Sequence, residues 1–444
     1  MLPYPVFLDS SHFGGLYGRF DILCADPSHV LFEKNHQTHL TLRDGSSEQL
    51  NTLPFAALRQ LLIEQGFNGI ATPDLPFCGG AMGYLSYDLG RAYSPIPDPI
   101  TDDIQLPHMQ MGIYPWAIIV DHQRQTTTLV SQSLSLQQLQ YIKDSFCASL
   151  PEAGKFQLNS AFQSNLDREA YLSRFQQVID YIHAGDCYQV NLAQRFSCAY
   201  QGAPWLAYLQ LRNRTHTPFS AYIESPQGCL LSLSPERFLP VDDGHVETRP
   251  IKGTRPRHLH PELDKGLKQD LANSEKDRAE NLMIVDLLRN DLGRSCITGS
   301  VKVPELFKIE SYANVHHLVS AVIGTLANPI DVIDLLQDCF PGGSITGAPK
   351  IRAMQIIAEL EPHQRSAYCG SIGYIGFNGQ MDSNICIRTL VATQEQNSAA
   401  KGSTGQLHCW AGGGIVADSA GDAEYQETFD KVNNLIHCLE EQFL

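Results

Sequence analysis

The chain has 444 residues, of which 43% are hydrophobic and 18% charged, as expected for a globular protein with a large core and two or three domains. Its formal net charge of −16 argues against a nucleic-acid partner, because nucleic-acid binding needs a basic face. The twelve cysteines include no CxxC pair, which favours reduced thiols in a cytoplasm over a zinc site or a disulfide framework. Neither a signal-peptide pattern nor an apolar run of membrane-spanning length is present, so the sequence predicts a cytoplasmic protein without membrane contact.

The first 166 residues predict mostly strands. The glycine-rich run 77–84 is interpreted as a closely packed strand rather than a phosphate loop. The stretch 131–166 is rich in Gln and Ser, contains one plausible helix at 134–149, and is the best candidate for a linker or excursion. The other predicted elements are strands at 7–11 and 19–23, a helix at 52–65, and paired strands at 109–120 and 126–131.

The remainder of the chain predicts both helices and strands. Ser274 is a candidate N-cap, and Gly293 is expected to end the helix that Ser274 starts. The predicted helices are 167–184, 204–213, 275–289 and 422–440, and the predicted strands are 188–196, 220–224 and 229–234.

The sequence predicts that Lys252 lies in a stiff turn, because residues 247–257 contain two prolines and Gly253. Arg249, Arg255 and Arg257 are close in sequence, and neighbouring cations disfavour the charged form of a lysine. A lysine that loses its proton is a nucleophile. A solvated surface lysine is the alternative, and this segment alone does not separate the two interpretations.

Glu236 is a candidate proton donor for Lys252. It follows a proline near the end of a predicted strand and stands 16 residues before Lys252. A hairpin at residues 242–244 would bring the two side chains together, and a carboxylic acid beside a reactive lysine can transfer a proton. The alternative is a surface salt bridge.

Two predicted helices carry acidic residues on one face near their starts. Asp277 and Glu280 lie one turn apart, and Glu424, Glu427 and Lys431 share a face. Acidic residues at these places commonly interact with the helix dipole. Two such helices could also present opposed carboxylates to one Mg²⁺, which leaves coordination positions for substrate oxygens.

Two glycine-rich segments suggest an anion site, which a chain of this net charge has to build from local cations or a metal. Residues 341–350 predict a turn onto a helix with Pro349 at its first position, and free N–H groups at a helix start bind anions. The segment is not a Walker A loop, because Ala348 stands where the lysine should follow. Residues 410–416 predict a second glycine turn, and Arg388 and Lys431 could add positive charge.

Several blocks in one order make the chain resemble the chorismate-utilising enzymes. The resemblance covers nearly the whole chain and implies an α+β fold in which two antiparallel sheets pack as a sandwich with helices outside. It also implies an N-terminal region, 1–150, intertwined in one body with a catalytic region, 167–440. The blocks that carry it are Ser234–Phe238, Arg278–Leu287, Arg289–Arg294, His317–Ser320, Gly347–Lys350, Gly412–Ser419 and Glu424–Thr428.

The lysine at position 252 makes the chain resemble one branch of that family in particular. Members that make anthranilate carry alanine at this position, whereas the lysine form is similar to members that aminate chorismate at C4 to give 4-amino-4-deoxychorismate, the precursor of p-aminobenzoate and folate. The resemblance thus implies a transferase. Anthranilate formation is the alternative within the family. A non-catalytic tryptophan-binding subunit is the remote alternative, and a P-loop ATPase loses most of its support with the missing lysine.

The resemblance also implies roles for individual residues. Lys252 would attack C2 of chorismate, Glu236 would act as general acid and His317 would flank the ring. Glu280 and Glu427 would hold Mg²⁺. The residues implied to bind the substrate are Thr254, Ser344, Tyr368, Arg388, Gly412, Gly413, Gly414 and Lys431.

A partner and a second ligand are implied as well. The family's ammonia usually comes from a glutaminase subunit, and this chain has no Gly-x-Cys-x-Gly elbow of its own. Several relatives bind tryptophan in the N-terminal half, with ordinary packing as the alternative for this chain. The residues that match such a pocket are Ser10, Tyr17, Gly18, Arg19, Phe20, Pro218, Phe219 and Ser220.

Overall fold

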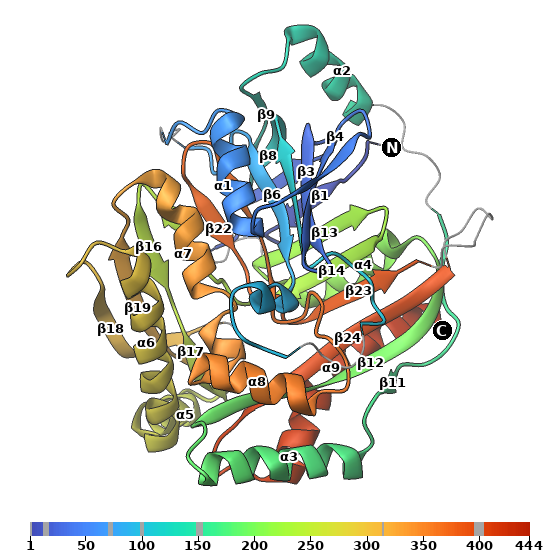
Figure 1. Cartoon of the computed structure of the whole chain (residues 1–444). Helices are drawn as coiled ribbons and strands as arrows, with labels where there is room; N and C mark the ends of the chain where they lie inside the picture. The colour runs from blue at the N-terminus through green and yellow to red at the C-terminus, as the bar shows by residue number, and fades with distance from the viewer. Residues whose placement is uncertain are drawn as a thin grey trace.

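Two large antiparallel sheets form the body of the protein, and helices cover their outer faces (Figure 1). The structure is a computed structural model that describes residues 2–11, 17–69, 74–97, 102–147, 154–312, 315–394 and 404–444. One hydrophobic core contains side chains from both sheets, for example Ile22 and Val190 from the first and Met82 and Val322 from the second. The predicted α+β sandwich is therefore confirmed.

The first sheet joins strands from distant parts of the chain. Its order is β10-β12-β24-β23-β14-β13-β1-β2-β8-β9, with β11 and β20 also paired to β12. The strands are β1 Val6–Asp9, β2 Phe20–Cys24, β8 Trp116–Asp121, β9 Thr126–Ser131, β10 Phe156–Leu158, β11 Gln163–Ser164, β12 Gln189–Gly202, β13 Phe219–Ser225, β14 Gly228–Ser234, β20 Gly347–Ala348, β23 Thr389–Thr393 and β24 Thr404–Ile415.

The second sheet has the order β17-β19-β16-β15-β22-β21-β6-β7-β3-β4-β5, with β18 paired to β19. Its strands are β3 His29–Lys34, β4 Gln37–Leu42, β5 Ser47–Leu50, β6 Gly80–Leu85, β7 Met109–Tyr114, β15 Val241–Asp242, β16 His245–Thr248, β17 Ile251–Pro256, β18 Lys302–Ser311, β19 Val315–Thr325, β21 Ser371–Gly376 and β22 Met381–Ser383. Both sheets thus combine strands from before residue 150 with strands from after it.

The helices pack mainly on the parts of the sheets that come from the second half. Within the described residues, no helix is long and apolar enough to span a membrane. The α-helices are α1 Pro54–Glu64, α2 Leu136–Cys147, α3 Arg168–His183, α4 Pro204–Thr215, α5 Pro261–Asn273, α6 Glu275–Ser295, α7 Val332–Cys339, α8 Lys350–Leu360 and α9 Gly421–Phe443. Three 3₁₀ turns add to them at η1 Tyr87–Ala92, η2 Pro329–Asp331 and η3 Gly343–Ile345.

Local sequence signals predicted many of these elements. Asp167 and Ser274 cap α3 and α6 by accepting from backbone N–H groups, as expected for N-cap residues. The run 77–84 contributes to β6, where a Cβ on Gly83 would lie 1.9 Å from the Gln110 carbonyl oxygen, so close packing explains this glycine. The helix predicted at 134–149 is α2, and residues 148 and 149 lie outside the described ranges.

Three local predictions were wrong and a fourth was right only in part. The predicted pairing of residues 109–120 with 126–131 is confirmed for β8 and β9. Residues 109–120 are nevertheless two strands in different sheets, β7 and β8, separated at Pro115, which cannot donate a ladder hydrogen bond. Helix α6 continues past Gly293 to Ser295, because a glycine inside a helix costs only about 1 kcal/mol. Pro349 stands at the N-cap of α8, one residue before the predicted place. The predicted glycine turn at 410–416 is mostly the end of β24.

Candidate active site

The segment around Lys252 is a bulged edge strand rather than a turn. Ile251 of β17 pairs with Val319 of β19, and Thr254 pairs with His317, so β17 contains one extra residue between these pairs. Gly253 takes φ +81°, where other residues are strained. Bulges of this kind redirect a side chain out of the regular alternation. Here the bulge contains Lys252 itself.

Burial lowers the pKa of the Lys252 amine, and the Lys431 charge lowers it further. The carboxylates of Glu236, Glu280 and Glu427 act in the opposite direction. The arginines that the sequence interpretation invoked have no part in this shift, because each is paired with carboxylates. Arg249 pairs with Glu247, Glu305 and Glu310, Arg255 with Asp270 and Asp277, and Arg257 with Asp264.

Glu236 follows β14, and its carboxyl lies close enough to Lys252 for their charges to interact. The β15–β16 hairpin between them forms where it was predicted. Burial raises the pKa of Glu236, while the Ser344 hydroxyl, which donates to its Oε1 at 2.8 Å, holds the rise back. Ser344 therefore touches the candidate acid, a contact that its expected substrate role had not included.

The carboxylates of Glu280 and Glu427 approach one another from α6 and α9. Burial raises the pKa of Glu280, and the negative charge of Glu427 adds to the rise. Glu427 pairs with Lys431 at 2.6 Å, and the Lys431 amine also donates to the Gly412 carbonyl at 2.8 Å. Glycine is needed at position 412, because a Cβ there would lie 2.6 Å from the Leu192 carbonyl oxygen of β12.

These residues suit a hard cation that keeps open positions. Within the part of the chain that the structure describes, no three His, Cys, Asp or Glu side chains form a complete cation site. The observation that fits a cation is the mutual repulsion of Glu280 and Glu427, two oxygen donors brought together from separate helices. Two protein carboxylates leave the other coordination positions to substrate oxygens and water.

His317, Thr254 and Arg388 form a second group beside the bulge. Thr254 Oγ1 and His317 Nδ1 are 2.9 Å apart. Burial lowers the pKa of His317, and the nearby Arg388 charge lowers it further, which favours a neutral imidazole. No hydrogen bond or ion pair joins the Arg388 guanidinium to another side chain among the described residues, so its charge is available to an anion.

Tyr368 is almost fully buried, and its ring stacks on Trp410 with 6.3 Å between ring centroids. Trp410 precedes Gly412 by two residues on β24, which places Tyr368 beside the glycine strand. The Arg365 guanidinium lies 5.6 Å from the centre of the Tyr368 ring and donates to the Ile345 carbonyl, next to Ser344. Tyr368, Ser344 and the glycine strand are thus connected through the core.

Sequence reasoning missed Gln189 and Asn191, which share one face of β12. Strand β12 lies between β20, which follows Ser344, and β24 with its glycines. Both amides are buried, and neither Gln189 Oε1 nor Asn191 Oδ1 has a hydrogen-bond partner within the described residues. The Gln189 amide occupies the space that a Cβ on Gly414 would need. Two amide side chains two positions apart, and therefore on one face of the predicted strand, were the available signal.

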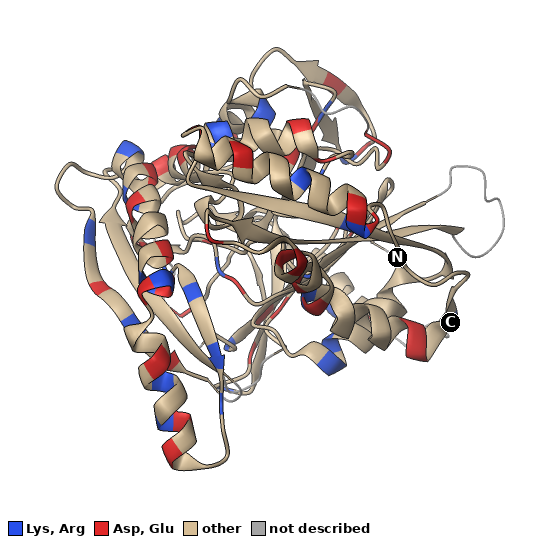
Figure 2. Cartoon of the chain, turned by 90° about the horizontal axis from the view of Figure 1, so that it is seen from below, with Lys and Arg blue, Asp and Glu red and all other residues tan. Residues whose placement is uncertain are grey.

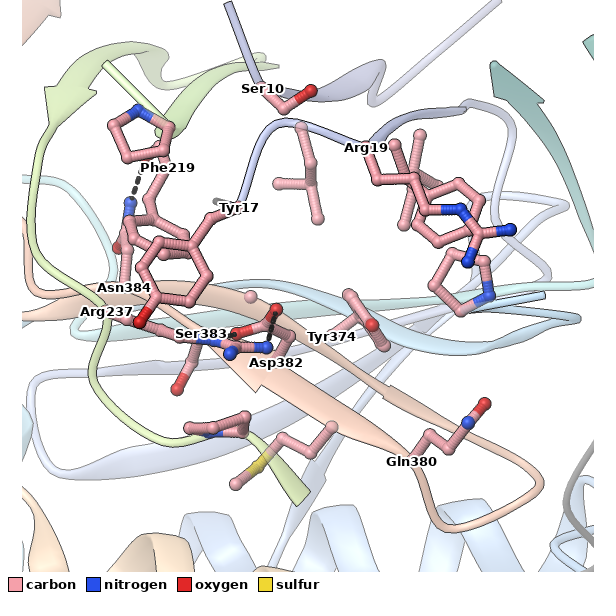
Figure 3. A pocket seen from close by; sticks show the side chains of 18 of the residues that line it. Ser10, Tyr17, Arg19, Phe219, Arg237, Tyr374, Gln380, Asp382, Ser383 and Asn384 are labelled. Atoms are coloured by element: carbon pink, nitrogen blue, oxygen red, sulfur yellow. Dashed lines mark hydrogen bonds and ion pairs between the residues drawn. The ribbon is translucent and has the colours of Figure 1, made fainter. Parts of the chain in front are cut away.

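A separate cavity of about 540 Å³ opens between β1, β13, β21 and β22 (Figure 3). Seven of the eight residues expected to form a tryptophan pocket line it, and Gly18 alone does not. The cavity walls are both aromatic and polar: the Tyr17 and Phe219 rings are 5.4 Å apart, and the Arg237 guanidinium lies 5.5 Å from the Tyr17 ring centre. Arg237 forms two hydrogen bonds with Asp382, which the sequence analysis had not singled out.

Acidic and basic residues both occur along the helices in the view from below (Figure 2). The site combines both signs in the same way, with Glu236, Glu280 and Glu427 around Lys252 and Lys431. Burial lowers the pKa of Lys252 and raises that of Glu236, and an amine and an acid shifted in opposite directions are typical of a catalytic site. The structure therefore assembles a candidate active site from β14, β17, β24, α6 and α9.

The family is established by sequence comparison. A sequence profile described as chorismate binding enzyme matches residues 16–437. The chain therefore belongs to the family of chorismate-binding enzymes.

Individual relatives cover almost the whole chain. A protein named aminodeoxychorismate synthase component 1, from Salmonella typhimurium strain LT2, is 49% identical over 99% of this chain and 94% of its own length. Anthranilate synthase component 1 from Synechocystis is 38% identical over 98% and 91%. The crystal structure of anthranilate synthase component I from Streptococcus pneumoniae TIGR4 superposes with a TM-score of 0.82 at 30% identity and covers 94% of this chain and 92% of that one.

Proposed function

We propose that this protein aminates chorismate at C4 with ammonia and so forms 4-amino-4-deoxychorismate through a covalent Lys252 intermediate. The observation that carries the proposal is that the side chains of Lys252 and Glu236 lie close enough for their charges to interact. Burial lowers the pKa of the amine from its usual 10.5 and raises that of the carboxyl from its usual 4.5. For each unit by which the difference between the two pKa values shrinks, the state with a neutral amine and a neutral acid gains about tenfold relative to the charged pair.

The neutral pair is the reactive one. The Lys252 nitrogen attacks C2, both ring double bonds shift by one position, and the C4–O bond breaks as Glu236 protonates the departing hydroxyl, which leaves as water. Ammonia then attacks C4, both double bonds shift back, and the C2–N bond breaks to release Lys252. A proton from the attacking nitrogen returns to the lysine–glutamate pair. The enolpyruvyl group takes no part.

Other residues of the site would hold the substrate. Arg388 and Lys431 supply positive charge for its carboxylates, and the buried Tyr368 stays protonated because burial keeps its pKa well above the usual range. His317 and Thr254 would flank the ring from β19 and β17. Glu280 and Glu427 would hold Mg²⁺, which neutralises a substrate carboxylate when bound.

The proposal is tested by identifying the product. Purified protein with chorismate, ammonium and Mg²⁺ is expected to yield 4-amino-4-deoxychorismate by mass spectrometry. Fluorescent anthranilate as the main product would instead establish the alternative reaction of this family. A protein that binds tryptophan but leaves chorismate unchanged, even with a glutaminase present, would be the non-catalytic subunit.

Removing the hydroxyl of Ser344 should move the pH profile upward. The hydroxyl lowers the pKa of Glu236, so Ser344→Ala raises that pKa further and keeps the acid protonated to higher pH. We expect the alkaline limb of kcat/KM to shift to higher pH. Ser344→Thr, which keeps the hydroxyl, is the control. An alkaline limb that stays in place in Ser344→Ala would show that this hydrogen bond does not control the pKa of Glu236.

Glu427→Gln should abolish metal-dependent turnover. The substitution removes one of the two expected Mg²⁺ ligands and leaves Lys431 without its partner. Activity measured against Mg²⁺ concentration checks the expectation, and Glu440→Gln near the far end of the same helix is the matched control. Wild-type activity with an unchanged Mg²⁺ requirement would remove Glu427 from the metal site.

We also propose that a glutaminase subunit supplies the ammonia, in line with the designation component 1 of the 49% identical relative.

We propose tryptophan as the occupant of the cavity of about 540 Å³, because its size suits a small ligand and the Tyr17 and Phe219 rings line it. Tryptophan should raise the thermal midpoint of the wild-type protein, and alanine should not. Tyr17→Ala removes an aromatic wall and should abolish the shift. No shift with tryptophan would favour ordinary packing, and equal shifts with both amino acids would show that the cavity does not select tryptophan.

A further inference from the structure

Asn281 is a completely buried amide that immediately follows Glu280 on α6. Its Oδ1 accepts from the Ser320 hydroxyl at 2.5 Å, and its Nδ2 is shared between the carbonyls of Pro250 at 3.4 Å and Leu318 at 3.5 Å. One side chain therefore joins α6 to β17 and β19.

The three elements that Asn281 joins are those that carry the chemistry. Pro250 stands two residues before Lys252, Leu318 follows His317, and Glu280 is the neighbour of Asn281 itself. The Pro250 carbonyl also accepts from the Ser320 backbone N–H at 3.2 Å. A fully satisfied buried network of this kind holds its members rigidly.

A second contact lies one helical turn away on the same face of α6. The Asp277 carboxylate pairs with Arg255 at 3.2 Å. A Cβ on Gly253 would come within 2.8 Å of Asp277 Cγ, so the bulge packs directly against this side chain. Helix α6 thus holds β17 before Lys252 through Asn281 and after it through Asp277. The two holding residues in turn stand on either side of Glu280.

We propose that Asn281 is a positioning residue that sets where Lys252 stands relative to Glu280, a role that rests on the proposed nucleophilic function of Lys252. An uncharged amide suits this place, because it crosslinks the strand without adding a charge beside the lysine. Its effect reaches the substrate only through Lys252. If Asn281 served only general stability, Asn281→Ala would lower kcat by the same factor whether or not Lys252 is present.

A double-mutant cycle separates the two roles. Asn281→Ala is expected to lower kcat about 10²-fold, as for a catalytic group displaced by about 1 Å, with KM for chorismate unchanged. In a Lys252→Ala background the same substitution should have little further effect. The control is Asn378→Ala, which removes another buried amide that bonds Gln380 in the β21–β22 hairpin. Equal losses of kcat in both backgrounds, or the same loss from Asn378→Ala, would overturn the proposal.

Hydrogen exchange tests the same inference without the reaction. Asn281→Ala should speed amide exchange within residues 250–256 and leave the neighbouring strand β16 unchanged, whereas Asn378→Ala should not affect 250–256. Ser320→Ala, which removes the donor to Asn281 Oδ1, should produce the same local acceleration if Asn281→Ala does not fold. Unchanged exchange in 250–256 would refute the positioning role even if the protein aminates chorismate. A missing amination product with local acceleration would refute the proposed function alone.

Discussion

Lys252→Ala is expected to lower kcat/KM for ammonia-dependent amination by about 10²- to 10⁴-fold, the range that one positioned catalytic group contributes. The effect should be greatest at low ammonia, where the covalent intermediate matters most. Burial lowers the pKa of Lys252 and raises that of Glu236, so the wild-type rate should follow a bell-shaped pH profile. The acid limb reports loss of the lysine proton, and the alkaline limb reports loss of the glutamate proton.

Replacing Lys252 should therefore remove the acid limb of the pH profile as well as most of the activity. Steady-state kinetics across pH give both readouts in one series. Lys268→Ala is the matched control, because Lys268 is an exposed lysine of α5 close in sequence. If Lys252→Ala kept the wild-type rate at low ammonia, the lysine would not be the nucleophile, and ammonia would attack the ring directly.

Arg365→Met is expected to lower the free energy of unfolding by about 3–5 kcal/mol, the usual cost of leaving one partner of a buried ion pair alone. Only 1% of Arg365 is exposed, and its guanidinium forms two bonds with Glu361, at 2.9 and 2.7 Å. It also donates to the Asn191 and Ile345 carbonyls. Methionine would leave the Glu361 charge and both carbonyls without these donors.

Chemical denaturation measures the loss. The double variant Arg365→Met with Glu361→Gln should recover part of it, because the stranded charge is then gone. Arg168→Ala is the control, since its pair with Asp422 is 60% and 71% exposed and should contribute less than about 1 kcal/mol. Equal effects of Arg365→Met and Arg168→Ala would mean that water reaches the buried pair.

Residue order alone predicted the features that depend on near neighbours. The apolar spacing of α3, the N-cap Ser274 and the β15–β16 hairpin all arise from contacts a few residues apart. The residue blocks of the family also indicated the sandwich of two antiparallel sheets. They placed seven of the eight tryptophan-pocket residues on one cavity, although those residues come from two segments about 200 positions apart.

Only the tertiary structure decided the environment of those residues. Residues 247–257 could not separate a solvated surface lysine from a partly buried one, because the groups that shield Lys252 from water come from elements distant in sequence. Nor could they show that Arg249 is neutralised by carboxylates up to 61 positions away. The glycines at 412–414 suggested a turn, but they lie in strand β24. Side chains at these positions would meet atoms of β12 and α9, and residues that distant in sequence could not be taken into account from the local pattern. Local patterns thus determined the elements and candidate residues of this protein. Long-range packing determined which groups lose water, and therefore which of them can react.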